Sequence, residues 1–546
     1  MGKNHNSQHI LLGIDLTGIQ QYIFASNRLI DVAGGSLLVK QATDTEGWIK
    51  ELLPDGASII MAAGGNAVIE FTCGKTAVKN FVSAYTRKLI EEAPGLEAAI
   101  AFVDVEERGF VDSLQKLIVK LAETKTRYIP SLYAPGFGIT ARCGETGFPA
   151  IQECGIRNGQ PISANIAARR KYYQSMQNSF DYYKLPEFKN GEETLQAVFP
   201  VEADNMGRSS GEKSLCAVVH VDGNGIGEKL SAWMETLKNS SSEAFITKYK
   251  ELSERLNKIT IGAMSACIDK VLGAIHVNDK NRWVLCSKAL NKEFELTVES
   301  GMLNLPLRPI LIGGDDLTFI CDGRIAHDLA ETALTHFSDQ VVEEFGEGEK
   351  IGACAGVAVV HTRAPFYRAY KIAEALCSSA KAKLRDNNNN TYDTSDCAMD
   401  WHMGMIAPNM GIDNLRKNHY RGISLRGTNR IYTLRPYVLG QAGDDKVTWN
   451  VLSRELLGDR ESAGLRGKIW GEMRSKVKGH LSELIKGDSE ELNAVLSAWN
   501  AELPIIGGMT NGYVGDNTPY IDAIEIMDIY WPLDGKDDHE DKEVQE

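Results

Sequence analysis

An internal repeat constrains the fold of this chain more than any other feature of its sequence. Two segments of the 546 residues follow the same predicted order of strand, helix, hairpin, helix and strand. The first begins with the apolar run at 10–14, and the second with the apolar run at 215–221. This order is typical of the ferredoxin-like, or split β-α-β, unit that is also called a palm. We therefore predict an α+β protein that contains two ferredoxin-like palm units.

Three acids of the second unit are predicted to meet at one edge of its sheet. Asp222 ends the first strand, and Asp315 and Asp316 lie in the turn of the hairpin. In the ferredoxin-like topology the end of the first strand lies beside that turn. Three neighbouring carboxylates repel one another unless a cation is bound, and Mg²⁺ or Mn²⁺ prefers such oxygen ligands. We predict a metal site here; the alternative is an exposed tight turn without a ligand, because Gly and Asp favour turns.

Glycines and one lysine extend this predicted site toward a nucleotide. Gly313 and Gly314 precede the two acids and would let the turn adopt positive φ and a phosphate come close. Gly223 would let the backbone after Asp222 join the metal shell or face phosphate oxygens. Lys381 would reach a triphosphate as a point charge, although a lysine near a helix C-terminus also complements the helix dipole. Two cations held here would activate a 3′-hydroxyl and neutralise a leaving pyrophosphate, which is the logic of nucleotidyl transfer.

Composition excludes several classes of protein. Asp and Glu outnumber Lys and Arg by 73 to 59, so the chain as a whole is not a coat for polyanions. The spacing of the ten cysteines does not indicate a disulfide framework, and we interpret them as reduced core residues. We find neither a signal peptide nor about 18 uninterrupted apolar residues, so we expect a cytoplasmic protein without a membrane span. The charged end of the chain at 536–546 is predicted to be a disordered acidic tail.

Five segments resemble the large polymerase/cyclase subunit of type III CRISPR effector complexes, the Cas-ten/Cmr-two group. They are GIDLTGIQQYIFASNRLIDVAGGSLL near the start, VVHVDGNGIGEKL and LIGGDDLTFI in the middle, and GVAVVHTRAPFYRAYKIAEALCSSAKAKLR and YTLRPYVL later. Together they touch most of the chain. The Gly-Gly-Asp-Asp turn occurs in other palms, but its combination with the Asp-Leu-Thr-Gly-Ile-Gln opening is specific.

The resemblance implies a domain plan, an activity and partners. The expected domains are a first palm at 1–128, an intervening domain at 129–212, a second palm with the Gly-Gly-Asp-Asp turn at 213–395 and a helical C-terminal domain at 396–535. Family members with an intact turn join ATP into cyclic oligoadenylates when target RNA is bound, so nucleoside triphosphates, RNA and other effector subunits are the implied partners. By position, Asp222, Asp315 and Asp316 would hold the metals, and Gly313 and Gly314 would line the nucleotide. Ser36 would lie near a base.

The sequence departs from the family pattern in three places. The first palm shows Gly65-Asn66-Ala67 where we align Gly314-Asp315-Asp316, so it would position an acceptor nucleotide, and Asp15 is interpreted as a relic, a cap or a polar contact. No His-Asp pair of a nuclease domain precedes the first palm, so we expect no DNA cleavage. Cys143 and Cys154 lack their Cys-x-x-Cys partners, which indicates a decayed zinc knuckle without metal.

Several alternatives remain open. The basic and aromatic run Arg169 to Tyr173 would contact RNA, or it is a packed helix with tyrosines beneath. Arg435 is either functional or part of a buried ion pair. For the whole chain, the leading prediction is a metal-dependent synthase of cyclic oligonucleotides. The alternatives are a non-catalytic nucleotide-binding scaffold of a CRISPR-like complex and a cyclase of the GGDEF type, which shares the palm.

Overall fold

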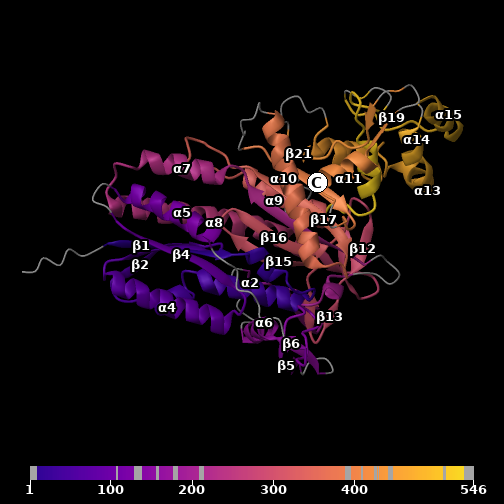
Figure 1. Cartoon of the computed structure of the whole chain (residues 1–546). Helices are drawn as coiled ribbons and strands as arrows, with labels where there is room; N and C mark the ends of the chain where they lie inside the picture. The colour runs from indigo at the N-terminus through magenta and orange to yellow at the C-terminus, as the bar shows by residue number, and fades with distance from the viewer. Residues whose placement is uncertain are drawn as a thin grey trace, which may run out of the picture.

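The computed structural model shows an α+β protein built around two antiparallel palm sheets (Figure 1). It describes residues 9–105, 109–127, 138–154, 159–175, 183–207, 214–387, 395–407, 410–423, 427, 429–440, 447–487, 489–507, 509 and 512–533. The acidic tail predicted at 536–546 lies outside these residues. Among the described helices, none is both long enough and apolar enough to cross a membrane.

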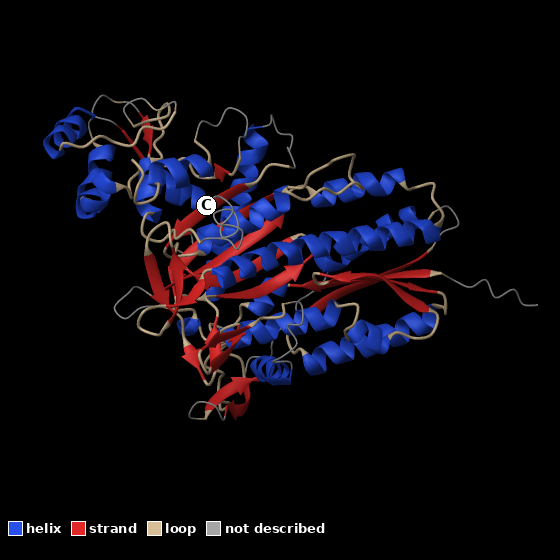
Figure 2. Ribbon diagram, turned by 180° about the vertical axis from the view of Figure 1, so that it is seen from behind, coloured by secondary structure: helices blue, strands red, loops and turns tan. Residues whose placement is uncertain are grey.

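The first sheet has four strands in the spatial order β2-β3-β1-β4, which is the ferredoxin-like order. Its strands are β1 (Ile10–Thr17), β2 (Ala57–Ala63), β3 (Asn66–Phe71) and β4 (Glu97–Asp104). The helices of this unit are α1 (Ile19–Ile23), α2 (Leu29–Thr43), α3 (Trp48–Leu52), α4 (Lys75–Glu92) and α5 (Phe110–Arg127). Figure 2 shows helices above and below these strands, so both faces of the sheet are covered. Helices α2 and α3 follow each other closely and are separated by a turn that precedes Gly47.

The second sheet repeats this order and adds two strands. It runs β15-β16-β9-β17-β18-β21, and its first four strands correspond to those of the first sheet. The strands are β9 (Leu215–Gly223), β15 (Leu307–Gly313), β16 (Asp316–Asp322), β17 (Ala353–His361), β18 (Ala398–Met403) and β21 (Tyr437–Val438). Its helices are α7 (Ile226–Thr236), α8 (Ser242–Gly273), α9 (Ala326–Ser338) and α10 (Phe366–Asn387). Because β18 and β21 follow residue 395, the sheet continues beyond the boundary at which we placed the end of the second palm.

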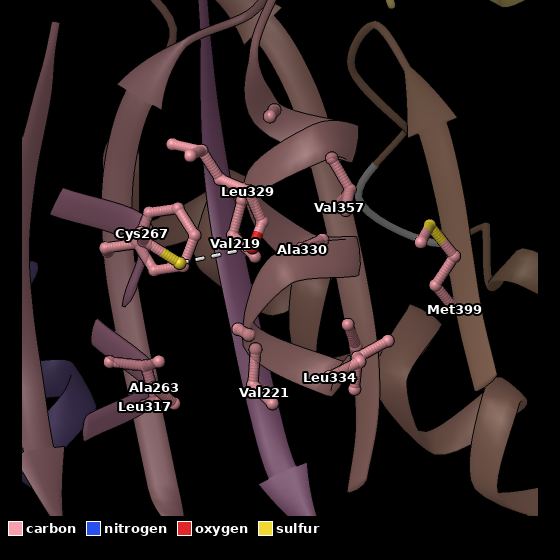
Figure 3. Close-up of a cluster of buried hydrophobic side chains, with 14 of the residues drawn as sticks. Val219, Val221, Ala263, Cys267, Leu317, Leu329, Ala330, Leu334, Val357 and Met399 are labelled. Atoms are coloured by element: carbon pink, nitrogen blue, oxygen red, sulfur yellow. Dashed lines mark hydrogen bonds between the residues drawn. The ribbon is translucent and has the colours of Figure 1, made fainter. Parts of the chain in front are cut away.

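Strand alternation divides the residues of β9 between the two faces of its sheet. Val219 and Val221 point toward α8 and α9, and Figure 3 shows them packed with Leu317, Leu329 and other apolar side chains. In this core the Cys267 thiol donates a hydrogen bond to the Leu329 carbonyl at 3.2 Å. The alternate residues of β9, which include Asp222, therefore face the opposite side, where α10 lies.

The ladder registers correct our alignment of the two hairpin turns. Ala63 pairs with Asn66 across the first hairpin, and Gly313 pairs with Asp316 across the second. Asn66 therefore corresponds to Asp316, so the first turn is shifted by one residue from the alignment that we expected. Both hairpins also carry a register shift at the same position, between Ile59 and Met61 and between Pro309 and Leu311.

Further elements surround the two palms. The intervening segment contributes β5 (Ala150–Cys154), β6 (Gln160–Ser163), α6 (Ala164–Ser175), β7 (Glu187–Asn190), β8 (Glu193–Val198) and a 3-10 turn (Ala203–Asn205). An insertion before β15 supplies β10 (Ile275–Val277), β11 (Trp283–Ser287), β12 (Lys292–Glu295), β13 (Val298–Glu299) and β14 (Met302–Asn304). Strands β13 and β14 form one sheet with β8 and β7, which joins the intervening segment to the second palm.

Short helices are the main regular elements of the C-terminal part, which lies next to the second palm (Figure 1). It contains α11 (Ile412–His419), β19 (Arg421–Ile423), β20 (Asn429–Ile431), α12 (Lys468–Glu472), α13 (Arg474–Lys476), α14 (Ser482–Lys486), α15 (Ser489–Trp499), α16 (Tyr520–Ile526) and two π-helical segments (Val451–Leu457 and Val477–Leu481). Arg435 is buried and pairs with Asp522 at 2.9 Å and Glu525 at 3.2 Å. Of our two interpretations of Arg435, the structure shows the buried ion pair.

The basic run on α6 is part of the protein interior. Arg169 is fully buried, donates hydrogen bonds to the Tyr22 and Ile23 carbonyls and lies over the Tyr22 ring. Arg170 forms two hydrogen bonds with the buried carboxylate of Asp31 on α2. These arginines hold α6 against the first palm. Of our two interpretations of this run, the contacts favour the packed helix and not the RNA-binding surface.

Cys143 is buried in a small apolar cluster with Ile162 and Ile166. Burial alone would raise the pKa of its thiol, but hydrogen bonds with Ser163 and Thr146 together outweigh this effect and lower the pKa. The side chain of Cys154 lies outside the described residues, as does residue 157, which is its Cys-x-x-Cys partner position and is an arginine in this chain, so the absence of metal at this knuckle stays a prediction.

Candidate nucleotide and metal site

The strand ends of the second palm bring its acids together as predicted. Asp222 on β9 pairs directly with Asp316 on β16 in the ladder, and directly opposed residues project from the same face of a sheet. The amide of Gly223 donates to the Asp315 carbonyl at 3.3 Å, so the hairpin turn is also bonded to the end of β9. The topology thus places all three acids at one sheet edge.

Burial and mutual repulsion strongly perturb two of these acids. Loss of solvent is the main cause that raises the pKa of Asp315 to about 6, and the nearby Asp222 carboxylate adds to it. The pKa of Asp316 rises to about 8 for the same two reasons, with Asp315 contributing further. Such shifts mark a place with too little positive charge for its carboxylates, and they cluster at functional sites.

Lys381 from α10 supplies one positive charge at this edge. Its ammonium group lies 2.5 Å from Asp222 and donates to the Gly223 carbonyl at 2.9 Å. Burial opposes the charge on Lys381, but the Asp222 carboxylate outweighs this effect and raises the pKa of the lysine. The predicted Lys381 is therefore at the site, with its charge directed at Asp222.

Each of the three glycines predicted at the site is favoured at its position for a different physical reason. A Cβ atom on Gly313 would lie 2.5 Å from the Cα of Gly64, so the two hairpin turns touch each other at glycine. A Cβ on Gly223 would lie 3.0 Å from the Cβ of Asp315, which explains a small residue after Asp222. Gly314 has φ +64°, and a Cβ atom there would meet nothing within 4 Å, so this glycine keeps the turn open above the acids.

Ser36 lies in a neighbouring cavity. It is on α2, and its hydroxyl donates to the Ile310 carbonyl of β15, so it links the two palms. The cavity beside it measures about 730 Å³ and is lined by α2, β2, β15 and α8, including Lys40, Lys258 and Gly65. Contact of Ser36 with a base stays a prediction.

The first palm contains a counterpart of the Asp–Lys pair that we did not predict from the sequence. Asp15 is opposite Asn66, as Asp222 is opposite Asp316. Lys125 of α5 forms an ion pair with Asp15. Of our three interpretations of Asp15, the structure shows a polar contact. The signal in the sequence was the spacing, because Lys125 follows Phe110, the first residue of α5, at the same distance as Lys381 follows Phe366 on α10.

A cavity of about 550 Å³ joins the two halves of the site. On one side it is lined by Asp15, Asn66 and Lys125 of the first palm. On the other side it is lined by the whole Gly313–Asp316 turn of the second palm. Cationic and amide groups therefore face the partly buried acid pair across one pocket, which has the size of typical small-molecule sites.

The acids of the second palm offer the donors that Mg²⁺ or Mn²⁺ prefers. Their oxygens are hard ligands, and a cation would offset the loss of solvent and the repulsion that raise the pKa values of Asp315 and Asp316. The residues present therefore fit such an ion. Within the part of the chain that the structure describes, however, these three carboxylates do not come within 4.8 Å of one another as a set.

The fold and the carboxylate arrangement together define a palm domain whose acids lie at the end of the first strand and in the hairpin turn. Residues 215–390 match the family model of Cas10/Cmr2, second palm domain. No curated protein matches the chain.

Solved structures of Csm1 and of Csm1–Csm4 cassettes match the chain at low sequence identity. The Csm1–Csm4 cassette in complex with pppApApA matches with a TM-score of 0.50 and 16% identity, covering 96% of this chain and 69% of that chain. Csm1 in T.onnurineus matches with a TM-score of 0.47 and 15% identity over 96% and 70%. The cassette in complex with cA4 has a TM-score of 0.41 and 18% identity over 69% of this chain, and the match spans only 53% of that chain. At these identities the likeness is one of fold.

Proposed function

We propose that the protein is a metal-dependent nucleotidyltransferase that makes cyclic oligoadenylate-type messengers from ATP. The observation that carries the proposal is the shared pocket, in which the perturbed acid pair of the second palm faces Asp15, Asn66 and Lys125 of the first. The Cas10/Cmr2 family match supports it, as does the shared fold with a cassette that is bound to pppApApA.

In the proposed reaction the two palms have different tasks. Asp222, Asp315 and Asp316 would hold Mg²⁺ or Mn²⁺, which when bound lowers the pKa of a 3′-hydroxyl and neutralises phosphate charge. Lys381 balances the charge of Asp222 and lies beside the Gly223 carbonyl, close to where a triphosphate would meet the acids. The open turn at Gly314 lets phosphate oxygens approach the backbone.

The first palm would position the nucleotide that attacks. Asn66 replaces an acid with a neutral amide, and Lys125 neutralises Asp15, so this half offers hydrogen bonds and a positive charge but no acid pair. The 3′-oxygen of the nucleotide held there forms a bond to the α-phosphorus of the other ATP. The bond from that phosphorus to pyrophosphate breaks, and the hydroxyl proton is released.

The test is the double substitution of the acid pair, Asp315→Asn and Asp316→Asn. ATP and Mn²⁺ are incubated with the purified chain, and products are separated by anion exchange and identified by mass. We expect product formation to fall by at least about 10³-fold, because the metal ligands are lost. Asp104→Asn is the matched control, since this strand-end acid is exposed, pairs with Lys75 and lies outside the pocket.

Two outcomes would contradict the proposal. Undiminished product in the double variant would exclude these acids from the reaction. Calorimetric binding of ATP to the wild-type chain without release of pyrophosphate, both alone and with added RNA, would instead indicate a nucleotide-binding scaffold.

A further inference from the structure

A second, softer set of ligands lies directly behind the acids of the second palm. Among the described residues, His220, Asp222 and Cys377 form a group in which one ring nitrogen, one carboxylate oxygen and the sulfur all lie within 4.8 Å of one another. His220 and Cys377 are 5% and 2% exposed, whereas the Asp222 side chain is 31% exposed. The group is therefore closed on the protein side and reached from solvent through Asp222.

The elements that carry this group explain its geometry. His220 and Asp222 are two residues apart on β9, so both project toward α10. Cys377 and Lys381 are four residues apart on α10 and lie on the same side of that helix. One strand face and one helix face thus bring a nitrogen, an oxygen and a sulfur ligand to the same place.

The first palm has no such ligands at the corresponding positions. Gly13 pairs with Val68 in the ladder, as His220 pairs with Thr318. A Cβ atom on Gly13 would lie 2.5 Å from Leu121 of α5, which occupies the place of Cys377 relative to the start of its helix. In the first palm, which lacks the acid pair, glycine and leucine therefore occupy the positions of His220 and Cys377. The half with the acid pair buries polar side chains there, which is unfavourable unless they are bonded.

We propose that His220, Asp222 and Cys377 form a binding site for Zn²⁺ or a similar borderline-soft divalent ion. Imidazole, carboxylate and thiolate are the ligand types that Zn²⁺ takes in proteins, and three protein ligands leave a fourth position for water. Mg²⁺ would not be held here, because it prefers oxygen ligands alone. The site is distinct from the hard-ion chemistry of Asp315 and Asp316, although both use Asp222.

Neighbouring groups are arranged to support an ion at this place. The Nδ1 atom of His220 lies 3.0 Å from the Thr318 hydroxyl, and this contact orients the imidazole ring. A hydrogen bond on the second nitrogen is the usual way in which a ligating histidine is oriented. The Cys377 thiol donates to the Cys354 carbonyl at 3.2 Å, and it would lose this proton when the metal–sulfur bond forms.

Lys381 competes with the ion for Asp222. Its ammonium group lies against one carboxylate oxygen of Asp222, and its positive charge opposes a second cation at this carboxylate. When its contact with Asp222 is lost, Lys381 can keep its hydrogen bond to the Gly223 carbonyl. If the proposed nucleotidyl transfer is correct, Zn²⁺ would inhibit it by removing both Asp222 and the Lys381 charge from the triphosphate.

The test measures metal binding to the full chain without nucleotide, with Co²⁺ as a spectroscopic substitute for Zn²⁺. We expect the wild type to show a thiolate-to-cobalt charge-transfer band that Zn²⁺ abolishes by competition. Cys377→Ser should remove the band and weaken Zn²⁺ binding more than about 10-fold, since one of three ligands is lost. Cys73→Ser is the matched control and should keep both, because Cys73 is exposed and far from the group in the fold.

A second variant keeps the proposal testable if Cys377→Ser does not fold. Lys381→Ala leaves the three ligands intact and removes their competitor, so we expect it to bind Zn²⁺ several-fold more tightly in calorimetry. A cobalt band that persists in Cys377→Ser, no band in the wild type, or unchanged or weaker Zn²⁺ binding in Lys381→Ala would overturn the proposal. None of these measurements uses turnover of ATP, so failure of the proposed reaction would be distinguishable from failure of the metal site.

Discussion

The two palms of this protein share a backbone but differ in their side chains at the same sheet edge. Both have the strand order of a ferredoxin-like unit, a bulge at the same hairpin position, and an aspartate at the end of the first strand paired with a helical lysine. Only the second palm follows this with two acids in the turn. The comparison shows that the Asp–Lys pair belongs to the shared scaffold, whereas the acid pair is what distinguishes the two halves.

The turns also differ in backbone conformation. In the first palm Gly64 and Gly65 both have positive φ, at +60° and +87°. In the second palm Gly314 has φ +64°, but Asp315 does not have positive φ. The φ of Gly65 is one that residues with a side chain rarely adopt, so an acid is strained at this position. The first turn therefore lacks the acid pair for steric as well as chemical reasons.

The largest effect that separates the palms should come from their two lysines. Lys381→Ala removes the cation that contacts Asp222, and we expect the rate of product formation from ATP to fall about 10²- to 10³-fold, as when a preorganised charged donor is lost. Lys125→Ala removes the corresponding cation of the first palm. We expect it to raise KM for ATP with a smaller change in kcat, because that half would bind the acceptor only.

Steady-state kinetics with ATP and Mn²⁺ measure both variants. Equal losses of kcat in Lys125→Ala and Lys381→Ala would mean that the palms act alike, and the comparison would fail. Thermal melting of each variant controls for folding, since both lysines are partly exposed and their ion pairs contribute little to stability.

Much of this arrangement could be predicted from the sequence, because apolar strands that end in Asp and a Gly-Gly-Asp-Asp turn are local signals. They correctly indicated that Asp222 lies at the same sheet edge as Asp315 and Asp316, and that the fold is α+β with two palm sheets. The register of the first turn was off by one residue. Glycines at 64 and 65 allow either alignment in the sequence, and only the ladder decides between them.

Non-local pairings were not predictable in the same way. The strands of 275–304 are short, and one of them, β14, pairs with β8, which is about a hundred residues earlier in the chain. The ligand group of His220 and Cys377 joins a strand to a helix more than 150 residues later. Neither residue stands out in the sequence, because histidine and cysteine in apolar runs are usually core residues.

A second difference between the palms concerns what their buried charges do. In the first palm the Asp31–Arg170 pair is buried and attaches α6 to α2. Arg170→Ala leaves the Asp31 charge buried without its partner, so we expect the free energy of unfolding to fall by about 3 kcal/mol in urea denaturation. Lys171→Ala, an exposed neighbour, should change it by less than about 0.5 kcal/mol. Weaker RNA binding by Arg170→Ala at unchanged stability would show instead that this arginine is an RNA contact.

The smallest predicted effect is a change of folding stability at low pH that comes from a histidine of the second palm. His327 of α9 is buried between Trp401 and Trp449, and neither ring nitrogen has a hydrogen-bond partner among the described residues. Burial, assisted by Arg435 and Arg466, lowers the pKa of His327 from 6.5 to about 3.

The sign of the pH dependence follows from this shift. Between pH 6.5 and 3 the unfolded chain binds a proton at this histidine and the folded chain does not, so folding stability falls as the pH is lowered, by up to about 1.4 kcal/mol per pH unit. His327→Phe should keep the stability at pH 7 and flatten the decline below pH 6.5. The decisive quantity is the difference between wild type and variant in urea midpoints from pH 7 to pH 5, because Asp328, whose pKa burial raises to about 6, titrates in the opposite sense in both proteins. If the urea midpoints of the two proteins fell in parallel, His327 would be protonated in the folded chain. The second palm would then not be more sensitive to acid than the first palm because of this residue.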